Sequence, residues 1–273
     1  MKRILVPVDF SPYSDKALQL AVLLARRTGA KLRLVHCVYT PLEWNSLTVR
    51  QQEQYPETVA RTVDAEIALS ALAETRQLQR VDLEFRVVHG TPYRQITNQA
   101  TLFKADLIVM GTHGNEKNDR PFIGSNSQRV MRLALCPVMS VKPDARVKTW
   151  KKVVFAADFE ANPSHAFERL LPLIDDLGSR VHLLFVNTPG RFRTTLQAEA
   201  HMQTFARKFP NLAFTFEVFN HLDIQSGVID FLKKAGVDCL IMATHNREHA
   251  PVYQLGQTEA VLFHTNIPVI SLR

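Results

Sequence analysis

Asp106-Leu-Ile-Val-Met-Gly-Thr-His-Gly114 joins a short apolar run to two glycines, and Gly124-Ser125 follows after nine intervening residues. The spacing is G-x2-G-x9-G-S. The apolar run predicts a buried strand that ends at Gly111. Glycine has no Cβ, so it reaches positive φ and lets backbone N–H groups converge on an anion. The stretch therefore predicts a phosphate-binding loop between a strand and a helix of about residues 125–135. A turn that uses glycine only for its backbone freedom is the alternative.

Four segments of the first half recur in the second half in the same order. They are 2–10 with 151–159, 31–38 with 180–187, 106–114 with 238–246, and 137–142 with 268–273. Four ordered matches indicate a duplicated domain. The polar stretch 143–150 shows no periodic pattern of apolar residues, which is typical of a linker. We therefore expect one domain over 1–146 and a second over 147–273.

Within each half, strand-like runs alternate with helical patterns. Ser11 and Pro12 predict a helix start and Gly29 its end, followed by a helix over 56–78, a strand over 81–89 and a helix from 92. The strand runs do not alternate strictly, which indicates burial on both faces and hence a parallel sheet covered by helices. Right-handed crossovers make this a doubly wound α/β fold.

Composition narrows the class of protein. The chain has 273 residues, 46% hydrophobic and 22% charged, which is typical of a soluble globular protein. The chain contains no run of eighteen apolar residues, so we expect no membrane-spanning helix. Residues 1–3 lead directly into a strand, unlike a signal peptide, and three cysteines without metal spacing fit a reducing compartment, so we expect a cytoplasmic protein. The net charge is +7, but the basic residues are scattered, which argues against a nucleic-acid role.

Taken together, these segments resemble the universal stress protein family. The likeness rests on Val6-Pro-Val-Asp9-Phe-Ser11, on the 106–114 segment, on Gly124-Ser125 and on Cys136-Pro-Val138. It covers essentially the whole chain as two tandem copies, and the first copy carries the complete motif that the family associates with ATP binding. The resemblance implies two tandem doubly wound, Rossmann-like domains. Each is a five-stranded parallel sheet in the order 3-2-1-4-5, covered by helices on both faces.

The same resemblance implies where an adenine nucleotide, ATP with Mg²⁺, would bind. The adenine would lie against Pro7, Val8, Asp9 and Val38, the ribose against Met110, Gly111, His113 and Gly114, and the phosphates against Gly124, Ser125 and Asn126. In an open α/β sheet of this order, ligands bind where the strand order reverses, here between the strands ending at Asp9 and Gly111. Asp9 has a second interpretation as the cap of a turn. His113 fits a structural part of the loop better than a catalytic base.

The second copy departs from the motif. Ala243, Asn246 and Gln257 replace Gly111, Gly114 and Ser125, and only Gly256 is retained. We therefore expect the second copy to have lost nucleotide binding. It would act as an intramolecular partner in a pseudo-dimer, with strands 138–141 and 269–272 pairing.

An alternative is that the second copy binds a different ligand. His245 and His249 have the spacing of a helical metal pair, with His221, Cys239 and His264 in the same half. The segment that carries the pair reads as a polar loop, so we predict no metal site.

The sequence contains no recognisable catalytic motif. It lacks the G-x4-G-K-[ST] phosphate loop and any positioned Ser-His-Asp or Cys-His set. An ATP-binding stress-response regulator with a protein partner, as a single chain or a dimer of chains, is therefore the leading hypothesis. A nucleotide-free interaction scaffold is the main alternative. A slow ATPase or self-phosphorylating activity, with Ser125 or Ser127 nearest the γ-phosphate, and an enzyme acting on a phosphorylated small molecule are the others.

Overall fold

The computed structural model describes residues 1–40, 44–114, 123–145, 150–161, 163–243 and 256–272. The strands are β1 (Arg3–Pro7), β2 (Lys31–Val38), β3 (Leu83–His89), β4 (Leu107–Gly111), β5 (Val138–Val141), β6 (Lys152–Ala156), β7 (Arg180–Asn187), β8 (Phe214–Asn220), β9 (Cys239–Ala243) and β10 (Val269–Leu272). The α-helices are α1 (Pro12–Thr28), α2 (Val49–Gln52), α3 (Pro56–Ala73), α4 (Pro92–Phe103), α5 (Ser125–Leu133), α6 (Ser164–Glu168), α7 (Leu171–Leu177), α8 (Thr195–Ala206), α9 (Ile224–Ala235) and α10 (Gln257–His264). Short 3₁₀ turns are η1 (Trp44–Ser46), η2 (Phe159–Ala161) and η3 (Pro189–Arg191).

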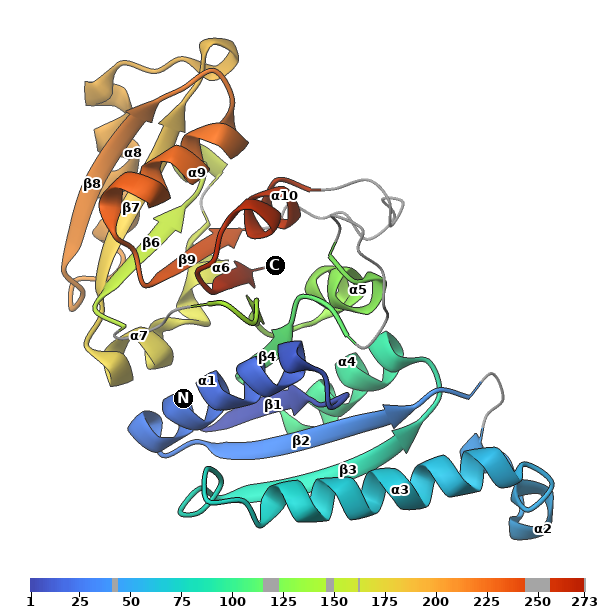
Figure 1. Cartoon of the computed structure of the whole chain (residues 1–273). Coiled ribbons are helices and arrows are strands. Elements are labelled where there is room, and N and C mark those ends of the chain that lie inside the picture. Colours follow the sequence, from blue (N-terminus) through green and yellow to red (C-terminus); the bar gives the residue numbers. More distant parts are fainter. Residues whose placement is uncertain (41–43, 115–122, 146–149, 162, 244–255, 273) are drawn as a thin grey trace.

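One ten-stranded sheet runs through the molecule in the order β3-β2-β1-β4-β5-β10-β9-β6-β7-β8 (Figure 1). All pairs within a half are parallel, and each half has the order 3-2-1-4-5 when its own strands are counted. β5 and β10 pair antiparallel, with Met139 opposite Ile270. The predicted fold class is confirmed, and the pairing covers the two edges that separate domains would leave open.

Two apolar layers cover the two faces of the sheet. Because successive strand residues point to opposite faces, Ile4 and Val6 of β1 join one layer and Leu5 joins the other. The first layer packs under α1, α3, α6, α7 and α8, and the second under α4, α5, α9 and α10. Helices on both faces explain why the strands are apolar without alternation.

Local sequence signals set most helix ends. The Ser11 hydroxyl accepts a hydrogen bond from Ser14 N (3.2 Å), Pro12 opens α1, and Gly29 closes it in the left-handed region at φ 68°. The predicted ends of two other helices, α3 and α5, were wrong by a few residues. α3 ends at Ala73 rather than 78, and α5 ends at Leu133 because Ala134 is already extended. Such shifts are common where tertiary contacts end a helix.

Polar contacts also join the halves. Arg132 Nε of α5 donates to Glu259 Oε1 of α10 (2.9 Å), and both side chains are nearly buried. The Lys142 ammonium donates to the carbonyl of Phe263, and the amino group of Met1 lies 2.6 Å from the Asp176 carboxylate.

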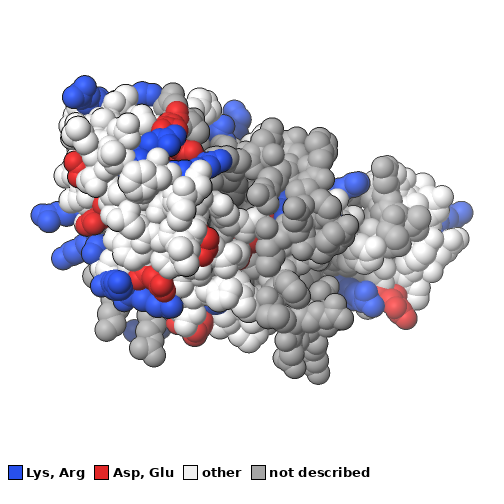
Figure 2. Space-filling model, turned by 90° about the horizontal axis from the view of Figure 1, so that it is seen from above, with Lys and Arg blue, Asp and Glu red and all other residues white. Residues whose placement is uncertain are grey.

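The described helices and the charges on one face bear on possible membrane and nucleic-acid contacts. Within the part of the chain that the structure describes, no helix is both long and apolar enough to cross a membrane. On the face drawn in Figure 2, basic and acidic side chains are intermixed over the described residues. This distribution agrees with the scattered charges of the sequence.

Candidate functional site

The chain between β1 and α1 brings Asp9 to the carboxyl edge of the sheet. Asp9 Oδ1 accepts hydrogen bonds from the N–H (3.1 Å) and the hydroxyl (2.6 Å) of Ser11. Phe10 between them has φ 60°, an uncommon value for a residue with a Cβ. Asp9 therefore does shape this turn, as its alternative interpretation expected, while its other oxygen, Oδ2, faces the end of β4.

The first two glycines of the motif are required by close approach. A Cβ at Gly111 would lie 2.6 Å from Cβ and 2.8 Å from the carbonyl carbon of Tyr13 in α1. A Cβ at Gly114 would overlap Asp9 Oδ2. The structure thus brings Asp9, Gly111 and Gly114 together at the point where the strand order reverses between β1 and β4.

The third glycine closes the loop back onto β4. Gly124 N donates to the carbonyl of Thr112 (2.8 Å), and a Cβ on Gly124 would lie 3.3 Å from that oxygen and 3.3 Å from His113 Cα. Ser127 is buried, and its hydroxyl donates to the carbonyl of Gly111 (2.9 Å). These bonds fix the first turn of α5 against the carboxyl end of β4.

Two expectations need correction here. None of Gly111, Gly114 and Gly124 has positive φ, so the expected conformational reason for the glycines is wrong, and the missing Cβ is what the packing requires. Ser127 was expected beside a phosphate, but its hydroxyl is turned into the protein and bonded. Ser125 is exposed at the first position of α5, and Asn126 is half-buried beside it.

His113 has structural partners in this loop. Its Nδ1 lies 3.1 Å from the Thr112 hydroxyl, and its ring lies 5.1 Å from that of Tyr13. These contacts agree with a structural role for the imidazole.

The start of α5 has the electrostatic character of an anion site. The first N–H groups of a helix have no acceptor within the helix, and the helix dipole makes this end positive. Gly124 is the N-cap, so no side chain of the cap residue accepts these hydrogen bonds. The exposed Ser125 hydroxyl adds a further donor at the same end.

The other expected site residues lie on the strands around this point. β1 pairs with β2 from Arg3 to Pro7, and Val8 N donates to the carbonyl of Val35 (2.9 Å). Val38 is buried at the end of β2, where its carbonyl accepts from Gly90 N (3.1 Å). Met110 is buried in the apolar layer under α4 and α5, so its side chain belongs to the core.

Trp44 anchors the segment that precedes α3 to the first half. Trp44 is buried and stacks on His89 of β3 at 5.4 Å, and the Thr62 hydroxyl of α3 lies 2.9 Å from Nε2 of that histidine. Burial lowers the pKa of His89, although the charge of Glu66 opposes the shift.

The carboxyl edge of the second half differs from that of the first. Asp158, the counterpart of Asp9, accepts from Arg191 NH1 (3.1 Å) and from the N–H of Glu160 (3.1 Å). Glu259 stands where the first half has Ser127, and it accepts from the N–H of Gly256.

A cavity of about 630 Å³ lies at this edge, lined by residues of β6, β7, β9, α9 and the first turn of α10. No pattern in the sequence predicted this cavity. One signal was available: α6 begins at Ser164, six residues after Asp158, whereas α1 begins three residues after Asp9.

The candidate metal pair His245 and His249 lies outside the described residues, as does Asn246. The other members of that set are separately engaged: Cys239 is buried, His264 Nδ1 lies 2.9 Å from the Ala260 carbonyl, and His221 lies beside Asp223 and Asp230. Among the residues with described positions, no group of three His, Cys, Asp or Glu could hold a metal ion.

Comparisons with known proteins identify the family of the chain. The sequence model of the universal stress protein family matches residues 1–142. A universal stress protein of Methanocaldococcus jannaschii is 30% identical over 149 residues, which are 52% of this chain and 82% of that protein. Another of Thermus aquaticus is 34% identical over 142 residues, covering 52% and 98%. The crystal structure of a universal stress protein from Archaeoglobus fulgidus superimposes with a TM-score of 0.70 at 18% identity, covering 98% of this chain and 95% of that one.

The chain therefore belongs to the universal stress protein family. The family model and these curated relatives match about half of the chain, whereas the Archaeoglobus structure matches nearly all of it. At 18% identity that structural likeness concerns the fold alone.

Proposed function

We propose that the protein is an ATP-binding regulator of the stress response, with one nucleotide bound by domain 1–146. The proposal rests on one arrangement above all. The first turn of α5 has no side-chain cap from Gly124, and it is bonded to the end of β4 beside Asp9 and Gly114. A helix start at a strand-order reversal is a common phosphate site in α/β proteins.

In this proposal the backbone does most of the binding. The N–H groups at Ser125 and Asn126 and the Ser125 hydroxyl hold the phosphates, with Mg²⁺ as a counter-ion. The 110–114 turn contacts the ribose, with Gly111, His113 and Gly114 at its core. The adenine lies against Pro7, Val8, Asp9 and Val38. No residue here is assigned a catalytic role.

We further propose that domain 147–273 takes the place of a second subunit. The antiparallel β5–β10 pair, the buried Arg132–Glu259 ion pair and the Lys142 contact with Phe263 support this role. The β5–β10 pair joins equivalent strands of the two halves, as a symmetric dimer would join those of two chains.

Calorimetric titration with Mg-ATP tests nucleotide binding. The full chain is first stripped of any nucleotide retained from purification. We expect one site per chain. In the Ser125→Asp variant, a carboxylate at the helix start would repel the phosphates by about 3 kcal/mol at 5 Å and an effective dielectric constant of 20. We therefore expect at least about a ten-fold weaker Kd, which corresponds to 1.4 kcal/mol.

Two controls isolate the charge. Ser125→Asn introduces a neutral side chain of the same size as aspartate. Its Kd for Mg-ATP should stay within a few-fold of the wild-type value. Thr195→Asp places the same charge at the first position of α8, which is exposed and lies in the other half. It should leave binding unchanged. Absence of binding by the stripped wild type would reject the proposed function and favour the scaffold hypothesis.

A further inference from the structure

The cavity of the second half has walls that are mainly apolar. Leu184 and Val186 of β7, Val228 of α9 and Met242 of β9 line it, and Met131 of α5 reaches it from the first half. A volume of about 630 Å³ lies within the usual range of small-molecule sites, roughly 300–1,000 Å³. The cavity thus has the size and lining of a binding site for a compact apolar molecule.

The helix start at this cavity is unsuited to phosphate. Glu259 is buried with 4% exposure, and its carboxylate accepts from the N–H of Gly256 at the start of α10. A phosphate here would meet a carboxylate that already occupies the positive end of the helix. In α5 the matching residue is Ser127, a neutral hydroxyl turned toward β4.

The charged groups of the lining compensate one another. Among its described residues, Arg132 lies 2.9 Å from Glu259 and Arg191 lies 3.1 Å from Asp158, so two cations face two anions. The lining therefore carries no net charge from these side chains. An anionic ligand would have to compete with the existing carboxylates.

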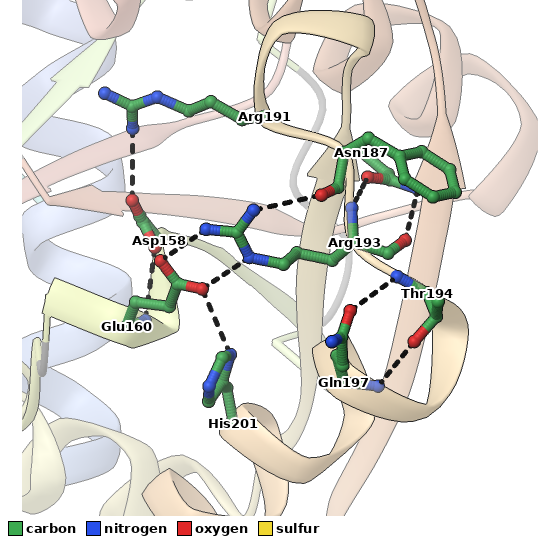
Figure 3. A network of polar contacts seen from close by, with 9 residues as sticks. Asp158, Glu160, Asn187, Arg191, Arg193, Thr194, Gln197 and His201 are labelled. Carbon is green, nitrogen blue, oxygen red and sulfur yellow. Dashed lines mark hydrogen bonds and ion pairs between the residues drawn. The ribbon is translucent and has the colours of Figure 1, made fainter.

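The cavity rim is held by a polar network at the ends of β6 and β7 (Figure 3). The Arg193 guanidinium donates twice to Glu160 (2.6 and 3.0 Å), and Asn187 accepts from the N–H of Arg193 through its side-chain oxygen (2.9 Å). These bonds tie the segment that carries Arg191 to η2. These bonds hold the wall of the cavity that Asp158 and Arg191 form.

We propose that this cavity binds an uncharged, predominantly apolar small molecule, and that it is a second ligand site distinct from the nucleotide site of the first half. The proposal goes beyond nucleotide binding and does not depend on it. The expectation that the second half is only a partner surface would then be incomplete.

Fluorescence titration of the full chain tests binding of an uncharged apolar molecule with two probes that share the anilinonaphthalene ring system. N-phenyl-1-naphthylamine is neutral, and 8-anilino-1-naphthalenesulfonate carries a negative charge. We expect saturable binding of one neutral probe per chain, at least about ten-fold tighter than that of the anionic probe. Millimolar Mg-ATP should not displace it.

Two variants fill the cavity. Ala157→Phe and Ala243→Phe each place a ring at its lining and should weaken neutral-probe binding at least about ten-fold. Ala213→Phe adds the same ring at an exposed position before β8 and should bind like the wild type. Circular dichroism and melting curves verify that each variant is folded.

Amide hydrogen exchange gives a readout that needs no variant. Saturation of the wild type with the neutral probe should slow exchange in α9 and α10 and leave α1 unchanged. The proposal is overturned by absence of saturable binding or by unaltered binding in both folded cavity variants. Tighter binding of the anionic probe, displacement by Mg-ATP, or protection confined to the first half would also overturn it.

Discussion

Gly111→Ala tests whether the motif glycine is needed for packing. The added Cβ would lie 2.6 Å from Tyr13 Cβ and 2.8 Å from its carbonyl carbon. Ordinary carbon contacts lie near 3.5–4.0 Å, so β4 and the start of α1 would have to separate by about 1 Å. Neither contacting atom is the end of a flexible side chain. Overpacking of this kind costs about 1–3 kcal/mol.

Thermal unfolding measures this cost. For a chain of this size each kcal/mol shifts Tm by roughly 2–4 °C, so we expect a decrease of about 2–12 °C. Gly190→Ala is the matched control, because its Cβ would meet nothing within 4 Å and its φ is not positive. Its Tm should stay within about 2 °C of the wild type. An equal Tm for Gly111→Ala and wild type would refute the close approach of β4 to α1.

Further predictions concern charges and thiols. Glu259→Gln should lower the free energy of unfolding by about 3 kcal/mol, because it removes the carboxylate of a buried ion pair, whereas Glu160→Gln in an exposed pair should lower it much less; chemical denaturation compares them. Burial raises the pKa of Cys37 to about 12 and of Cys136 to about 11, so iodoacetamide at pH 8 should label both slowly in the folded protein and rapidly in denaturant. Burial raises the pKa of Glu84, but its bonds to Lys31 and Arg33 outweigh this and hold the pKa below its usual value. Its stabilising effect is therefore present above the unfolded pKa and lost as pH falls through the folded pKa. Glu84→Gln should lower Tm at pH 7, and the difference from wild type should shrink as the pH falls through the folded pKa of Glu84.

Local sequence determined the number and kind of the main elements. Apolar runs without alternation predicted buried parallel strands, and Ser11, Pro12 and Gly29 marked the ends of α1. The recurrence of four segments predicted two domains of the same fold, and the ten-stranded sheet has the corresponding strand order. These features depend on interactions within a few residues or on the period of the chain, so they are readable without coordinates.

Only the tertiary structure decided how the candidate sites are built. Gly111 is constrained by Tyr13, which lies 98 residues earlier in the chain. Arg132 pairs with Glu259, which lies 127 residues later. The cavity of the second half is lined by segments that are far apart in the sequence, from Met131 to Leu272. Such distances of approach are set by packing between segments remote in sequence, and residue type alone does not encode them. The sequence therefore predicted a ligand site at the carboxyl edge of the sheet, and this stays a prediction. The packed structure decided which helix start is open to an anion and which is closed by its own carboxylate.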